Sequence, residues 1–248
     1  MPLLLKFTKR QFVPTAFVSI LYVFVLLLLI LKMNSNSMIY YKISPYTYAS
    51  EILDFFFSLI VSIPFSYYTF FMKKTNFLEY VSLRISKKTY IKTYFGAIMV
   101  MCFSMIFLVN FVGVLFSYSI AQVTSSEIRP TLEGYILGQM QMDNPILFGI
   151  VWSLHKAFVG TMICLFAQII ALYVENFFLA LCVPFVYVIL ENFFTSILGL
   201  SRYSLTTTFV LNRLKPTAMS VGNLIIAISV FFVIINIARI VLRGYYEK

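Results

Sequence analysis

The sequence predicts an all-α polytopic membrane protein that forms a single transmembrane domain over residues 1–248. The first observation is the composition. Hydrophobic residues make up 61% of the chain and charged residues only 11%, whereas soluble domains have about 25% charged residues. The second is that the apolar residues gather in six long stretches, each close to the roughly 20 residues that a helical span requires. So few charges cannot cover a water-soluble domain, and a disordered chain would have the opposite composition.

The six predicted spans are helices, because a membrane barrel would show alternating segments of about ten residues instead. They cover residues 14–31, 48–72, 94–118, 146–173, 177–198 and 218–242. Residues 1–12 set apolar side chains against basic ones, which predicts an elbow helix lying in the inner interface. Residues 199–216 are too short to span twice and too apolar for a plain loop. We therefore expect an outer re-entrant segment of short helices covered by protein.

The positive charges predict the orientation, since Lys and Arg concentrate on the cytoplasmic side of membrane proteins. With both termini in the cytoplasm, most of the 19 Lys and Arg residues fall on the inner side. The strongest bias lies around the loop after the second span, which contributes Lys73, Lys74, Arg84, Lys87, Lys88 and Lys92. The net charge of +10 is then explained by topology and by anionic headgroups of the lipid bilayer, without a nucleic-acid partner.

The same loop carries a helical pattern within residues 73–90. Apolar Phe77, Leu78, Val81 and Ile85 recur at helical spacing, and Asn76 is a suitable N-cap. The pattern predicts a short amphipathic helix on the cytoplasmic side. Such a helix either binds a partner protein or rests on the lipid headgroups.

The sequence contains none of the common catalytic or nucleotide-binding motifs. It contains no GxxxxGK[ST] phosphate-binding loop, no GxSxG elbow and a single histidine, His155. The cysteines Cys102, Cys164 and Cys182 lie in apolar stretches without a CxxC spacing. We therefore expect no catalytic residues, no metal site and no ATP-binding site here, and no enzymatic activity of the chain itself.

Ionisable residues inside predicted spans are costly and are candidates for function. Glu51 and Asp54 lie near the outer start of the second span, where we expect their side chains to extend to the interface. His155 and Lys156 lie in the fourth span and Glu191 in the fifth.

A tight turn at Glu175 and Asn176 joins the fourth and fifth spans, which makes them antiparallel neighbours. At 1.5 Å per residue, Lys156 and Glu191 come out at a similar depth of about 10–14 Å from the outer end. The sequence therefore suggests a Lys156–Glu191 ion pair, with His155 beside it. The pair either lines a transport pathway or braces the bundle.

Taken together, these elements resemble the membrane subunit of a type-2 ABC exporter, the short six-span class found in bacterial drug, peptide and lantibiotic exporters. The resemblance rests on the elbow helix 1–12, the basic loop ending Leu83-Arg84-Ile85-Ser86-Lys87-Lys88-Thr89-Tyr90, the turn at Glu175 and Asn176, and the re-entrant segment 199–216. It covers nearly the whole chain and is one of architecture, without a sharp motif.

The resemblance implies that the helix within 73–90 is a coupling helix that binds a separate cytoplasmic ABC ATPase subunit. Its docking surface would be Phe77, Leu78, Glu79, Tyr80 and Arg84. ATP and Mg²⁺ would be bound by that partner, and a second permease copy or a paralogue would complete a dimer around the pathway. The expected cargo is an amphipathic peptide or a lipophilic compound, and the expected location is the bacterial cytoplasmic membrane. The alternative is a non-transporting immunity or sensor protein that binds a peptide.

Overall fold

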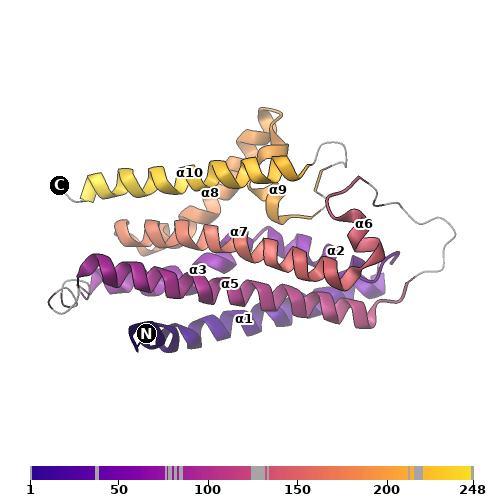
Figure 1. The fold of residues 1–248 in the computed structure, drawn as a ribbon, viewed down its shortest axis with the longest axis horizontal. Coiled ribbons are helices and arrows are strands. Elements are labelled where there is room, and N and C mark those ends of the chain that lie inside the picture. The colour runs from indigo at the N-terminus through magenta and orange to yellow at the C-terminus, as the bar shows by residue number, and fades with distance from the viewer. Residues whose placement is uncertain are drawn as a thin grey trace.

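The computed structural model is a bundle of long helices that run roughly along one common axis (Figure 1). It describes residues 2–36, 39–75, 77, 80, 83, 86–123, 132, 134–211, 213–214 and 220–246. Over these residues the chain is helical, without a β-strand. The helices are α1 (Pro2–Asn36), α2 (Ser44–Asp54), α3 (Phe57–Lys74), α5 (Lys87–Ile120), α6 (Gly138–Asp143), α7 (Pro145–Tyr173), α8 (Phe177–Ile197), η1 (Ser201–Tyr203), α9 (Thr206–Phe209) and α10 (Val221–Tyr246).

Several helices are long and apolar enough to span a membrane, which identifies a multi-pass membrane protein. Within the described residues five single helices qualify, and a sixth span results if α2 and α3 are counted together. The five are Gln11–Ser35, Thr89–Ile120, Pro145–Tyr173, Phe177–Ile197 and Val221–Val241. The start of α1 and the end of α10 lie at the same end of the bundle as the start of α5 (Figure 1).

The predicted second span is a pair of helices rather than one straight helix. α2 and α3 meet at Phe55 and Phe56 with a bend of 59°. The backbone stays hydrogen bonded through the bend, where the amide of Phe56 donates to the carbonyl of Leu53 at 3.0 Å and the amide of Ile60 donates to the carbonyl of Phe56 at 2.9 Å. The bend therefore leaves these two amides satisfied, as a membrane interior requires.

α7 is the central helix of the bundle. It contacts α3, α5, α6, α8, α9 and α10, and it is the most buried of the candidate spans. Glycines allow close contact between α5 and α7: a Cβ atom on Gly149 would collide with the side chain of Val114 on α5. This packing holds the polar residues of α7 in fixed positions.

The parts of the prediction that fall on residues outside the described set stay predictions. Leu78, Glu79 and Arg84 of the expected coupling helix are such residues. Phe77 and Tyr80 are described and both are helical. The interfacial placement of residues 1–12 and the cytoplasmic side of the termini also stay predictions.

We expect the substitution Gly149→Leu to destabilise the bundle by about 1–3 kcal/mol, because a larger side chain overpacks the contact with Val114. The measurement is the temperature at which buried Cys102 and Cys164 react with a thiol dye in detergent. Gly96→Leu on α5 is the control, since a Cβ atom there meets nothing within 4 Å. Equal effects of the two substitutions would contradict tight α5–α7 packing.

Candidate functional site

An ion pair between Asp54 and Lys156 lies in the interior of the bundle. The Lys156 ammonium contacts the Asp54 carboxylate, and both side chains are fully buried. Asp54 is the last residue of α2, directly before the bend, and Lys156 is near the middle of α7. Within the described residues neither group has a further hydrogen bond that satisfies it. Each charge is therefore stabilised mainly by the other, as a buried pair requires.

The prediction that Lys156 pairs with Glu191 is wrong, because the ion-pair partner of Lys156 is Asp54. The expectation that Asp54 extends to the interface is wrong for the same reason. Consecutive residues of a helix point about 100° apart, so His155 and Lys156 face different neighbours. Lys156 faces the α2–α3 bend, whereas Nε2 of His155 lies 2.7 Å from the carbonyl oxygen of Thr208.

Glu191 instead holds the segment that follows α8. Its carboxylate accepts hydrogen bonds from the Ser204 hydroxyl at 2.8 Å and from the Leu205 amide at 3.1 Å. Both donors lie between η1 and α9, and their side chains are buried. Together with His155, Glu191 fixes this segment against α7 and α8. Of its short helices, α9 is largely buried by protein, whereas no residue of η1 is buried. The depth of the segment in a membrane stays a prediction.

Phe57 connects the ion pair to this outer segment. Its ring lies 5.4 Å from the Lys156 ammonium, in a cation–π arrangement. On the other side its centroid is 5.0 Å from that of Phe209 in α9. A Cβ atom on Gly160 of α7 would come within 2.9 Å of the same ring. Phe57 is thus enclosed. A shift of the α2–α3 bend would change its contact with Phe209 and so displace α9.

A second polar network crosses the bundle nearer the α3–α5 connection. The amide nitrogen of Gln11 on α1 donates to the hydroxyl of Tyr94 on α5 at 3.1 Å. That hydroxyl is 3.1 Å from the hydroxyl of Thr69 on α3, which also donates to Gln168 of α7. All of these side chains are buried, so the network ties four helices together.

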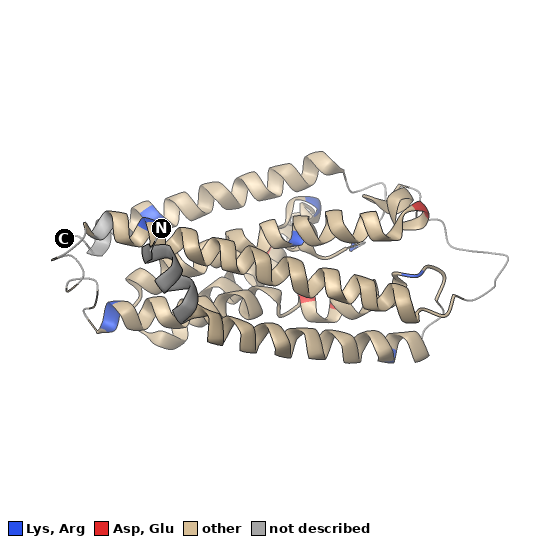
Figure 2. Ribbon diagram, turned by 60° about the horizontal axis from the view of Figure 1, so that its bottom comes forward, with Lys and Arg blue, Asp and Glu red and all other residues tan. Residues whose placement is uncertain are grey.

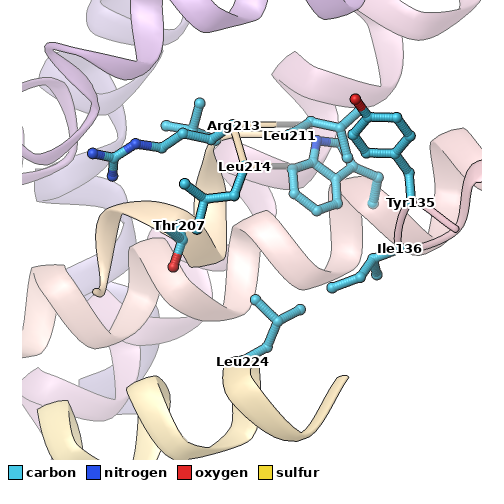
Figure 3. Close-up of a pocket in the computed structure, with 9 residues that line it drawn as sticks. Tyr135, Ile136, Thr207, Leu211, Arg213, Leu214 and Leu224 are labelled. Carbon is cyan, nitrogen blue, oxygen red and sulfur yellow. The ribbon is translucent and has the colours of Figure 1, made fainter. Parts of the chain in front are cut away.

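A small pocket lies between the outer segment and the beginnings of α7 and α10. Its volume is about 20 Å³, which is room for about one water molecule. Figure 3 shows the Arg213 guanidinium pointing away from Tyr135 and Ile136 on the opposite wall. The guanidinium donates to the side-chain oxygen of Asn192 on α8. Such a pocket is too small for the expected cargo.

The remaining charged side chains form no centre for metal chemistry in the described residues. No three His, Cys, Asp or Glu side chains gather there as metal ligands would. Figure 2 shows long stretches of the helices without any charged residue.

We expect Lys156→Met alone to cost about 3–5 kcal/mol of stability, because Asp54 would be left buried and uncompensated. The double variant Asp54→Leu with Lys156→Met should recover most of this loss, since it removes both charges. The measurement is denaturant unfolding in detergent micelles. The control double variant, Lys156→Met with Glu191→Leu, should show no recovery, and recovery there would support the pairing with Glu191.

We expect Glu191→Ala to loosen the outer segment by removing a charged acceptor worth about 1.5–3 kcal/mol. Hydrogen exchange should accelerate by about 10–100-fold at the Leu205 amide, while the amides of α7 stay protected. Glu175→Ala in the exposed turn at the other end of α8 is the matched control. Unchanged exchange at Leu205 would contradict the anchoring role.

Comparisons with known proteins found no match to a protein-family model, to a curated protein or to a solved structure. The class that the chain is shown to have is therefore that of a helical, multi-pass membrane protein.

Proposed function

We propose that the chain is the membrane-spanning subunit of an ATP-driven exporter of the ABC class. In this proposal two such subunits, or this chain and a paralogue, form the pathway in a bacterial cytoplasmic membrane. Separate ATPase subunits bind ATP and Mg²⁺ and drive it. The cargo is an amphipathic peptide or a lipophilic compound.

The observation that carries the proposal is the exposure of large side chains in the basic connection between α3 and α5. Tyr80 is 61% exposed and Leu83 is 82% exposed, although this connection is flanked by Lys73 and Lys74 on one side and by Lys87 on the other. Apolar groups exposed beside charges at the end of a membrane bundle are typical of a protein-binding surface. A cytoplasmic ATPase would cover them.

Phe77 plays a different part from Tyr80 in the proposed docking element. Its ring packs against Tyr90 of α5 at 6.2 Å between centroids, so it is partly buried in this chain. Phe77 would then position the element, and Tyr80 would enter the partner's groove. This division supports Tyr80 as the residue to test first.

The buried network offers a route from the docking element into the bundle. Thr69 lies five residues before the end of α3 and Tyr94 lies seven residues after the start of α5. At 1.5 Å per residue they lie about 8 Å and about 10 Å from the connection, respectively. A displacement of the connection by a partner would therefore act on α1 and α7 through these two hydroxyls.

We expect the tagged chain, purified from membranes of its native host, to bring with it a protein that contains ATP-binding motifs and hydrolyses ATP. Tyr80→Ala should lower the recovered ATPase activity by more than about tenfold, because it removes an anchor of the interface. The measurement is the rate of ATP hydrolysis per mole of tagged chain, together with mass spectrometry of the partner.

Tyr203→Ala in η1, at the opposite side of the candidate spans, should leave the recovered ATPase activity unchanged. A wild-type chain that purifies without any ATP-hydrolysing partner would contradict the exporter proposal. It would favour the alternative of a non-transporting immunity or sensor protein that binds a peptide. Full recovery of the ATPase with Tyr80→Ala would remove Tyr80 from the docking surface.

A further inference from the structure

One side of α2 is turned away from the bundle and continues onto α8. Tyr48, Glu51, Ile52 and Phe55 follow each other at helical spacing and are all exposed, Phe55 by 60%. The opposite side of α2 is buried. These four residues, with Phe56 of the bend and Phe185 of α8, are called the α2 face below.

Aromatic contacts give the α2 face a defined shape where it crosses from α2 to α8. The rings of Phe56 and Phe185 are stacked with centroids 6.2 Å apart. Phe55 meets Phe185 edge to face at 5.9 Å and meets Phe56 edge to face at 4.8 Å. Phe55 and Phe56 remain substantially exposed in spite of these contacts. Part of each ring is thus free to contact an apolar group.

Glu51 is a carboxylate on this otherwise apolar and aromatic surface. No ion pair of Glu51 is seen in the described part of the chain, and the ion pair made by the same helix joins Asp54 to Lys156. Glu51 lies seven residues into α2, about 10 Å along the helix from Ser44. An unpaired carboxylate within a membrane is costly unless a cation or water meets it, and α2 is part of a candidate span together with α3. Among ligands, charge complementarity therefore favours a positively charged occupant.

We infer that the α2 face is a recognition site for the ammonium or guanidinium group of an amphipathic ligand. Glu51 binds the cation, and the exposed aromatic rings contact the apolar part of the ligand. Aromatic faces also attract cations that lie over them, so Tyr48 supports the same charge preference. The inference rests on the proposed function in one respect, which is that the ligand would be the cargo of the exporter.

The test uses the full chain in nanodiscs of phosphatidylcholine, which carries no net charge. The probes are a dye-labelled amphipathic helical peptide of leucine and lysine and the same peptide with every lysine acetylated. Binding is measured by fluorescence anisotropy, with empty nanodiscs as the blank. No ATPase is present, so the result is independent of the copurification experiment and each can fail by itself.

The wild-type chain should bind the lysine peptide more tightly than the acetylated peptide. Glu51→Gln should raise the Kd for the lysine peptide by about tenfold and leave the Kd for the acetylated peptide unchanged. Phe55→Ala should weaken the binding of both peptides. Glu175→Gln, which removes the same charge from the exposed turn between α7 and α8, should behave as the wild type.

Three outcomes would overturn the inference. The first is equal affinity of the wild-type chain for the two peptides. The second is an unchanged Kd for the lysine peptide with Glu51→Gln. The third is that Glu51→Gln converts a dimer to a monomer, measured by native mass spectrometry, while peptide binding is unchanged. That last result would assign Glu51 to an interface between two copies of the chain.

Discussion

The rest of the structure depends on the requirement that a charge buried in a membrane bundle meets an opposite charge. Asp54 and Lys156 satisfy this requirement for each other, and in doing so they fix the bend between α2 and α3 against α7. Because a buried ammonium is costly without its carboxylate, the bend cannot move away from α7 while the pair is intact. Phe57, packed between Lys156 and Phe209, extends this constraint to the outer segment.

α7 distributes the polar contacts of the bundle according to helical geometry. Lys156 points to α2, and its neighbour His155 points to the carbonyl oxygen of Thr208. Further along the helix, Gln168 accepts a hydrogen bond from Thr69 of α3. α7 is thus tied at two levels, to the end of α2 just before the bend by the ion pair and to the later part of α3 by hydroxyl contacts. A movement of α2 and α3 relative to α7 would have to change both sets of contacts.

Hydropathy located the helical stretches well, because a span of about 20 apolar residues leaves a strong local signal. The bend at Phe55 and Phe56 was missed, since no glycine or proline marks it, whereas Pro64 lies inside α3 without breaking it. The partner of Lys156 was missed because the hairpin between the fourth and fifth spans suggested its nearest neighbour in sequence. Contact between the second and fourth spans is set by tertiary packing, which one sequence does not reveal.

Glu51 and Asp54 show how packing assigns different roles to two carboxylates of one helix. They are three residues apart, yet Asp54 is buried against α7 and Glu51 is exposed on the α2 face. Because Lys156 is already neutralised by Asp54, it provides no charge for Glu51, and the cation that we infer for Glu51 would come from a ligand. The Asp54–Lys156 pair therefore braces the bundle, and by occupying the buried lysine it leaves Glu51 available for recognition.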